Sequence, residues 1–590
     1  MRRTSGTLCK SCCGNRLRGS TAAVMQHAAG LPLAIGAASH RQPVVAAEST
    51  RHGSPLEIRF YFAGASVAIN WNRLMSRSSR DRVQRSLLTS PTPRAPRPFF
   101  DRGEAPAARR LLLLSYHFPP SRAVGALRWQ KLARYAATRG WGLDVVTLDP
   151  SSLAEHDADA LQELPSGVRI FGVALPQSGV DHVVDGMLAT RRWLKRRFHR
   201  ARTSTAAKPS IAASPRKDSF AWSELRKFPL SAEEFARLYS SWLDYSVMGT
   251  WAHRVAKTAA ALATVTDYRA VVTCGPPHMV HEAGRRVART TGLPLVMDFR
   301  DPWSLVQRVP EVFASPIWLH YAKRYEGAAI NSAALVIVNT EPHRDRLRRA
   351  YPALRAPIIT VTNGYDDESL PPSRRSSRFV MAYAGTVYLD RDPRPLFRAA
   401  ARVIRERSLT PQQFALIFMG SGDSLGGVSL IDMARDEGIA NFVELRPSAP
   451  RRQALEFLAG ASMLVSLPQD SDMAIPSKVF EYMRYGAWLL ALASPGSATE
   501  LLLRGSNADI AERNDIDAMA RIIGRRYDEH VQGIVPAPIA ADRRFSREQQ
   551  ANLLFDALTR ELPARAASAA TAPSTASPHV PVSASTRGRA

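Results

Sequence analysis

Apolar and polar positions follow two different periodicities along the chain from residue 110 onward. Short apolar runs, of which Leu111–Tyr116 is the first, are typical of buried parallel strands. Leu127–Thr138 repeats its apolar residues every three or four positions, which predicts an amphipathic helix. A second apolar run at Leu143–Leu148 completes the order strand, turn, helix, strand within about 40 residues. This order is typical of the βαβ unit of a doubly wound α/β sheet.

The same pattern predicts two sheets of comparable size, one on each side of a Ser/Arg-rich linker at 373–377. Further strands of the first sheet are expected at Val168–Val173, Ala270–Cys274, Leu293–Asp298 and Ala334–Asn339. Those of the second are expected at Phe379–Ala384, Phe414–Phe418, Phe442–Leu445, Met463–Leu467 and Trp488–Ala493. Because such sheets bind ligands at the carboxyl ends of their strands, we expect a site in a cleft between two Rossmann-like domains.

The chain is therefore expected to hold two α/β domains between two tails. Its parts are a basic, disordered extension (1–105), a first Rossmann-like domain (106–370) with a basic insertion (181–218), a second Rossmann-like domain (371–545), a helix (546–563) and a disordered tail rich in Ala, Ser, Thr and Pro (564–590).

Charge is the compositional feature that most changes this picture. The net charge is +27, and residues 1–110 hold 18 basic and 5 acidic residues, so about half of the excess lies outside the predicted domains. Such a bias favours anionic partners, namely nucleotides, membrane surfaces or nucleic acid. No aromatic-basic recognition module is visible, so nucleic acid is not expected. The cations of Thr190–Arg202 predict either an amphipathic element lying on anionic lipid or a solvated helix followed by a flexible loop.

Cysteine content and hydropathy bear on location. The four cysteines, Cys9, Cys12, Cys13 and Cys274, are too few and too clustered for a disulfide framework. A Cys9-x-x-Cys12-Cys13 metal site would need a second Cys or His pair, which does not follow, so no metal is expected. No run of 18 apolar residues predicts a spanning helix. We expect a cytoplasmic protein, with contact at the inner face of the membrane as the alternative to a purely soluble one.

The segment Ala474–Gly486 is the strongest candidate for chemistry. Pro476 suits the first turn of a helix, which leaves the N–H groups of Ser477 and Lys478 free at its positive end. A phosphate binds well at such an end, and Glu481, one turn further, places a carboxylate where it can accept the two hydroxyls of a ribose. An ordinary helix start is the alternative interpretation of the same residues.

A second group of candidates follows the predicted strand at 379–384. Gly385 lets the backbone approach a ligand closely, Thr386 follows it, and Arg391 lies within reach of a diphosphate. Together with Lys478, Arg391 is expected to stabilise negative charge that develops on a nucleotide leaving group.

The first domain offers its own loop residues. His278 follows the strand that ends at Cys274, where it can hydrogen-bond a sugar hydroxyl, although a lone histidine is more often structural. Asp298, Arg300 and Asp301 end the next strand, and they form either a cleft lining or a satisfied ion-pair network. The first turn, up to Gly125, lacks the Gly-x-Gly-x-x-Gly and Walker patterns, which disfavours NAD enzymes and P-loop ATPases.

These motifs, taken in order, resemble family 4 glycosyltransferases of the GT-B type, especially those of bacterial polysaccharide assembly. The resemblance covers roughly residues 108–560. The motifs that carry it are Ser-Tyr-His-Phe-Pro-Pro (115–120) with Gly125, Gly-Pro-Pro-His (275–278), Asp-Phe-Arg-Asp-Pro-Trp (298–303), Val-Asn-Thr (338–340), Thr-Asn-Gly-Tyr-Asp (362–366), Tyr-Ala-Gly-Thr (383–386) and Pro-Ser-Lys-Val-Phe-Glu-Tyr (476–482).

The resemblance implies a retaining transfer of a sugar from a UDP or GDP donor to a saccharide or polyprenyl-linked acceptor, with no bound metal. It implies catalytic roles for His278, Arg391 and Lys478, with Arg391 and Lys478 on the diphosphate. It also implies that Glu481 binds the ribose and that Gly125 borders the acceptor. Residues 298–301 are expected to line the cleft, and Gly385, Thr386 and Ser477 complete the donor site.

One position departs from the family pattern. Many members carry a second Glu eight positions before the ribose-binding one, where this chain has Met473, with Asp472 adjacent. Either Asp472 substitutes for that Glu or backbone groups hold the sugar. A GT-B sugar-nucleotide epimerase and a non-enzymatic binder of membrane or nucleic acid remain alternative functions.

Overall fold

The computed structural model describes the backbone of residues 44–48, 57–62 and 65–70. It also describes 95–103, 109–153, 155–176, 232–307, 309, 313–373, 376–388, 391–468 and 471–562. The expected insertion at 181–218, the basic stretch at 190–202, the cysteines near the N-terminus and the tail at 564–590 lie outside these residues.

The first domain is built on an eight-stranded sheet with the order β11-β10-β9-β8-β5-β6-β7-β4. Its strands are β4 (Phe100–Asp101), β5 (Arg109–Ser115), β6 (Trp141–Leu148), β7 (Val168–Val173), β8 (Ala270–Gly275), β9 (Leu295–Phe299), β10 (Leu335–Val338) and β11 (Ile358–Thr360). All pairings are parallel except that of β4 with β7.

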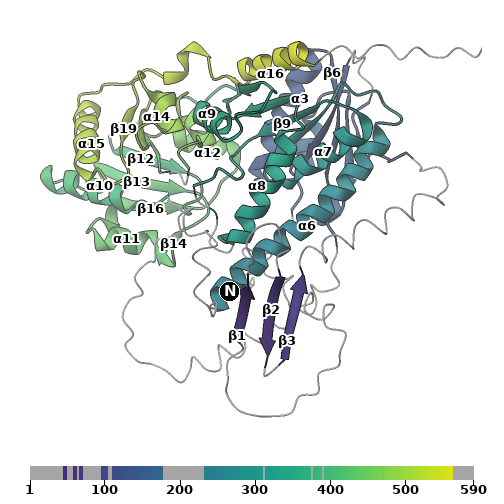
Figure 1. Cartoon of the computed structure of the whole chain (residues 1–590). Coiled ribbons are helices and arrows are strands. Elements are labelled where there is room, and N and C mark those ends of the chain that lie inside the picture. Colours follow the sequence, from purple (N-terminus) through teal and green to yellow (C-terminus); the bar gives the residue numbers. More distant parts are fainter. Residues whose placement is uncertain are drawn as a thin grey trace, which may run out of the picture.

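Helices cover both faces of this sheet (Figure 1). They are α3 (Leu127–Thr138), α4 (Asp159–Gln162), α6 (Ala232–Leu262), α7 (Met279–Thr291), α8 (Pro316–Ile330) and α9 (Glu341–Ala350). Successive side chains of a strand point to opposite faces, so β5 feeds two cores: Leu112 and Leu114 pack with α6 and α7, while Leu111 and Leu113 pack with α3.

The second domain has a six-stranded parallel sheet with the order β16-β13-β12-β17-β18-β19. Its strands are β12 (Phe379–Ala384), β13 (Phe414–Met419), β16 (Val443–Arg446), β17 (Met463–Ser466), β18 (Trp488–Leu492) and β19 (Asp509–Ala511). Its helices are α10 (Arg394–Glu406), α11 (Leu430–Asp436), α12 (Arg451–Ala459), α13 (Ser477–Tyr482), α14 (Ala498–Leu503) and α15 (Ile516–Val531). The predicted fold class, two Rossmann-like α/β domains, is confirmed.

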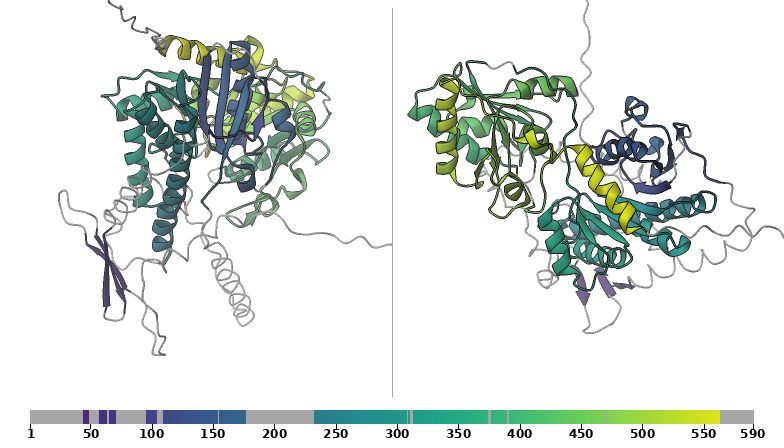
Figure 2. Two further views of the ribbon diagram at one scale, coloured as in Figure 1. Left: turned by 90° about the vertical axis from the view of Figure 1, so that its right-hand side faces the viewer. Right: turned by 90° about the horizontal axis from the view of Figure 1, so that it is seen from above.

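The last helix returns to the first domain. Helix α16 (Arg547–Glu561) lies beside α3 at the junction of the two domains (Figures 1 and 2). Its Leu554, Phe555 and Leu558 are buried in the core that α3 shares with β5 and β6. The chain therefore crosses between the domains twice.

The two crossings are joined to each other. The Tyr365 N–H donates to the carbonyl of Phe545 at 3.2 Å, and the Arg547 N–H donates to the carbonyl of Tyr365 at 2.8 Å. A Cβ on Gly364 would stand 2.6 Å from the Phe545 carbonyl, so the close approach requires glycine there. Ion pairs reinforce the junction, because Arg547 and Lys131 both contact Asp366.

Part of the N-terminal stretch differs from the expectation of disorder. Strands β1 (Val44–Glu48), β2 (Glu57–Phe62) and β3 (Ala65–Asn70) form an antiparallel sheet. Strand β4 extends the first sheet upstream of the expected boundary at residue 106. Within the described residues, no helix combines the length and apolar character that crossing a membrane requires.

Candidate functional site

The two domains meet at the carboxyl ends of their strands. The loop before α13 touches the first domain at two points: the Gln307 side-chain amide donates to Asp472 at 2.7 Å, and the Thr340 hydroxyl donates to the Met473 carbonyl at 2.6 Å. Gln307 follows β9 and Thr340 follows β10. The segments that follow β9 and β10 therefore contact the loop that leads into α13.

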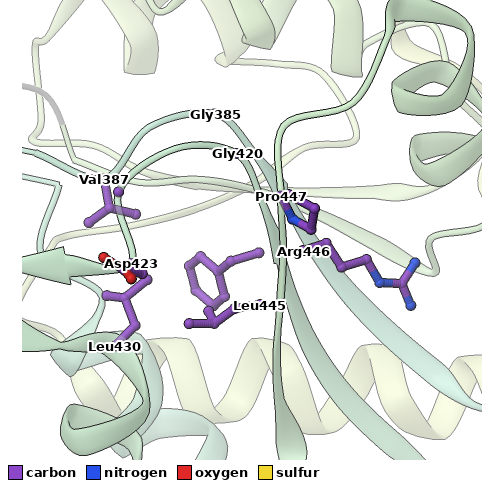
Figure 3. Close-up of a pocket in the computed structure, with 10 residues that line it drawn as sticks. Gly385, Val387, Gly420, Asp423, Leu430, Leu445, Arg446 and Pro447 are labelled. Atoms are coloured by element: carbon purple, nitrogen blue, oxygen red, sulfur yellow. The ribbon is translucent and has the colours of Figure 1, made fainter. Parts of the chain in front are cut away.

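A cavity of about 370 Å³ opens at the strand ends of the second domain (Figure 3). Glycines shape it, because Gly385 and Gly420 have φ of +134° and +152°, and a Cβ on Gly420 would stand 2.5 Å from the Gly385 carbonyl. Val387, Asp423 and Leu430 line one side, and the side chain of Arg446 points away from them.

Lys478 lies directly beside this cavity. A Cβ added to Gly385 would stand 2.6 Å from its Nζ, and Nζ lies 3.7 Å from the centroid of the Tyr383 ring. The ammonium group is shielded from solvent and has no hydrogen-bond partner among the described residues. Burial, aided by the nearby positive charge of Arg391, lowers the pKa of Lys478 to about 6.

Arg391 is held against the same turn. Its Nη1 donates to the Thr386 carbonyl at 3.2 Å, and its guanidinium stacks 4.2 Å from the centroid of the Tyr388 ring. The Tyr383 hydroxyl also donates to the Thr386 carbonyl, at 2.9 Å. The structure thus brings Gly385, Arg391 and Lys478 together.

The helix that was expected to bind phosphate is short. Helix α13 spans six residues and follows Pro476, which is its N-cap; Ser477, its first residue, is exposed. The dipole of a six-residue helix is weaker than that of a long helix, so it attracts a phosphate less strongly than we expected from the sequence. Most of the positive charge at this edge therefore comes from side chains.

Glu481 already forms an ion pair with Arg451. Arg451 Nη2 donates to its carboxylate at 2.8 Å, and Arg451 also pairs with Glu368 in the segment that joins the domains. The carboxylate is partly exposed, so its second oxygen remains accessible. The ribose-binding role predicted for Glu481 would therefore be shared with Arg451.

Asp472, the expected substitute for the missing Glu, is engaged in the domain contact. Besides accepting from the Gln307 amide, it donates its own backbone N–H to the Gln307 side-chain carbonyl at 2.7 Å. Met473 is buried. In this arrangement Asp472 binds the other domain.

Asp298 does not line a cleft, which corrects one prediction. Its side chain is fully buried, accepts two hydrogen bonds from Arg128 at 2.8 and 3.0 Å, and accepts a third from the Trp129 indole at 2.9 Å. Both carboxylate oxygens of Asp298 accept hydrogen bonds from buried side chains, so Asp298 stabilises the fold. Asp301, two residues beyond the strand, is exposed.

Arg300 packs where Gly125 leaves room for it. A Cβ on Gly125 would collide with the guanidinium. Arg300 donates to the carbonyls of Gly275 and Pro276, and its own carbonyl accepts from the Asn339 amide at 2.8 Å. Gly125, Arg300 and the Gly-Pro-Pro-His loop therefore pack together.

His278 stacks on Trp303, with ring centroids 5.2 Å apart and an interplanar angle of 15°. Its Nδ1 is buried without a hydrogen-bond partner. Burial lowers the pKa of His278 well below its usual range, helped by His281 and Arg300. The lowered pKa favours the neutral imidazole, which has one donor and one acceptor nitrogen.

Several site residues escaped the sequence prediction. Arg128, Arg451 and Gln307 carry no local motif, and each finds its partner 30 to 170 residues away. In the part of the chain that the structure describes, no group of three or more His, Cys, Asp or Glu is arranged to hold a metal ion.

Comparisons with known proteins bear on this site. No protein-family model matches the chain. The chain is similar to D-inositol 3-phosphate glycosyltransferase 1 of Catenulispora acidiphila, with 27% identity over 262 residues that cover 42% of this chain and 61% of that protein. The protein called D-inositol 3-phosphate glycosyltransferase in Thermobifida fusca is 26% identical over 204 residues, covering 32% and 46%. The chain thus spans 61% or less of the length of these relatives. Their similarity confirms the resemblance to glycosyltransferases seen in the motifs.

Two solved structures are similar over most of the chain. Sucrose-phosphate synthase of Thermosynechococcus elongatus is 14% identical and covers 77% of this chain and 99% of its own, with a TM-score of 0.47. A glycosyltransferase of Rickettsia africae is 12% identical and covers 78% and 100%, with a TM-score of 0.48.

Proposed function

We propose that this chain is a retaining glycosyltransferase that moves a sugar from a UDP or GDP donor to a saccharide or polyprenyl-linked saccharide in the assembly of a surface polysaccharide. The observation that carries the proposal is the buried ammonium of Lys478 beside Gly385 and Arg391, which has no hydrogen-bond partner in the described part of the chain. The relatives named as glycosyltransferases support the reaction class.

Two neighbouring cations call for an anion with more than one charge. Lys478 and Arg391 repel each other, and burial makes the charged form of Lys478 costly without a counterion. A diphosphate between them would supply at least two negative charges and several acceptor oxygens. The absence of a side chain at Gly385 lets the Lys478 ammonium lie close to the backbone of this turn.

The adjoining cavity suits the nucleoside of the donor. Its volume of about 370 Å³ lies within the range of small-molecule pockets. Apolar side chains such as Val387 and Phe418 offer surfaces for a base. Glu481, one turn into α13, would accept from the ribose hydroxyls with its free oxygen.

The proposed reaction uses these residues as follows. The bond between the sugar C1 and the diphosphate oxygen breaks, and its electron pair stays on the diphosphate, where Lys478 and Arg391 stabilise the new charge. The acceptor oxygen bonds to C1 from the same face and passes its proton to the leaving diphosphate oxygen. His278, on the facing loop, hydrogen-bonds a hydroxyl of the transferred sugar. If the acceptor is lipid-linked, the proposal includes a peripheral contact of the protein with an anionic membrane.

Calorimetry with a panel of UDP- and GDP-sugars tests the proposal. At least one sugar nucleotide is expected to bind the wild-type chain and to lose binding in Lys478→Met, whereas Arg398→Ala, on the outer face of α10, keeps it. Incubating the bound donor without acceptor separates the reaction classes, because an epimerase forms a new sugar nucleotide and a transferase does not. Absence of binding by every donor contradicts the proposal.

A further inference from the structure

Helix α6 overhangs the carboxyl edge of the first sheet. The Trp251 indole donates to the carbonyl of Val173, the last residue of β7, at 3.1 Å. Asp244 lies seven residues earlier, which places it roughly 10 Å further along the helix, beyond the strand ends. Figure 1 shows this half of α6 projecting away from the sheet. The helix thus carries Asp244 toward the side on which the second domain lies.

Asp244 is unlike the other inward-facing carboxylates of this domain. It makes no hydrogen bond or ion pair with any described residue, and burial raises the pKa of its carboxyl to about 6. The fully buried carboxylates each have two or more strong donors; they are Asp144, Glu282, Asp298 and Glu326. A partly buried carboxylate that no described residue pairs with lowers the stability of the fold, and no packing contact compensates for that loss.

The face of α6 that carries Asp244 packs on the loop after β5. Trp251 lies seven residues after Asp244, on the same face of the helix, and its ring centroid lies 4.9 Å from that of Tyr116. Tyr116 in turn packs edge-on against His117, with ring centroids 4.9 Å apart. The charge of Asp244 helps to raise the pKa of Tyr116, after burial.

The neighbouring face of α6 packs on the loop after β9. Tyr245, the residue after Asp244, accepts a hydrogen bond from the Trp303 indole at 3.2 Å. Trp303 stacks on His278, which follows β8. Helix α6 is therefore packed on the loops at the carboxyl ends of β5 and β9 where it carries Asp244.

We propose that Asp244 binds the hydroxyl groups of the acceptor and selects for an uncharged saccharide or polyol at this position. This inference rests on the proposed function, because the acceptor must enter opposite the donor-binding cavity. A carboxylate accepts from two neighbouring hydroxyls at once, and the Tyr116 ring gives the sugar an apolar surface. The same negative charge repels an acceptor that carries a phosphate at this point.

Saturation-transfer NMR with methyl α-D-glucoside, methyl α-D-mannoside, methyl α-D-galactoside and myo-inositol tests the proposal in the presence of UDP. At least one probe is expected to bind the wild-type chain, and Asp244→Ala should weaken that binding about 10- to 100-fold. Asp244→Asn, which keeps the shape and loses the charge, should give a smaller loss. Lys257→Ala, an exposed position on the same helix, is the matched control and should bind as the wild type does.

Thermal unfolding of Asp244→Ala distinguishes binding from structure. Removing an unpaired, partly buried carboxylate should leave the melting temperature unchanged or raise it, whereas a structural role lowers it. Unchanged affinity in Asp244→Ala, or no probe bound by the wild type, overturns the inference. Asp244→Ala is expected to bind UDP-glucose as the wild type does, which calorimetry measures. If the wild type binds no sugar nucleotide, the proposed function fails. If it binds a sugar nucleotide but no acceptor probe, only the inference about Asp244 fails.

Discussion

Buried charges are treated in opposite ways at the facing edges of the two domains. In the first domain, Asp298 is surrounded by Arg128 and Trp129, and all three side chains satisfy one another. In the second, the Lys478 ammonium lies against an aromatic ring, and no described residue hydrogen-bonds to it. A paired buried charge holds a fold together, whereas an unpaired one indicates a ligand that is bound during function. The next four experiments test that distinction.

The largest effect is expected on the stability of the first domain. Arg128→Ala would leave Asp298 buried without a counterion, which should lower the free energy of unfolding by about 3–5 kcal/mol. Chemical denaturation measures this loss. Arg134→Ala, on the same helix, breaks only the exposed pair with Glu163 and should cost at most about 1 kcal/mol. Equal losses in the two variants would show that Asp298 is not a structural centre.

Removal of the second-domain cations should affect the reaction and spare the fold. Lys478→Met and Arg391→Ala should each lower kcat/KM. The expected loss of transition-state stabilisation is about 2–4 kcal/mol for each variant. The melting temperature of Lys478→Met should stay the same or rise, because an unpaired buried amine is removed. Steady-state kinetics with the donor found by calorimetry checks the first effect, and a calorimetric scan checks the second. A fall in melting temperature with unchanged turnover would reverse the assignment.

Donor affinity should depend on pH in a known direction. The pKa of Lys478 is about 6 in the free protein, and a bound diphosphate raises it, so binding takes up a proton above pH 6. Affinity should therefore fall as pH rises from about 6, by at most about 1.4 kcal/mol per pH unit. Calorimetry at pH 7.5 in two buffers with different ionisation enthalpies measures this uptake. Lys478→Met should abolish it, and proton release on binding would contradict the model.

The smallest effect is expected at Glu481, which is partly exposed and already paired. Glu481→Gln should change the free energy of unfolding by less than about 1 kcal/mol, because its ion pair with Arg451 lies near solvent. The same change should reduce the preference for UDP over 2′-deoxy-UDP, since the carboxylate no longer accepts from the ribose. Competition binding of the two nucleotides measures that preference. An unaltered ratio would remove Glu481 from the donor site.

The fold was largely predictable because its signals are local. Apolar runs such as Leu143–Leu148 became strands, and the period of Leu127–Thr138 became α3 with the predicted bounds. The signals that were missed are short: β19 has three residues, and the strands β1 to β3 in the basic extension have five or six residues each.

The candidate site was predictable where a residue lies in a motif at or near the end of a strand. Gly385 and Arg300 directly follow β12 and β9, and Lys478 lies in the motif at 476–482. Partners such as Arg128 of Asp298 come from distant segments, so no spacing in the sequence announces them. Asp244 lies in the middle of a helix, where its lack of a partner becomes visible only after the helix is packed.

The double crossing between the domains sets a mechanical limit. Backbone hydrogen bonds at Tyr365 join the segment that leaves the first domain to the segment that returns to it. The domains also touch where Gln307 and Thr340 contact the loop before α13. Rotation of one domain about the joint at Tyr365 would therefore have to break these two contacts.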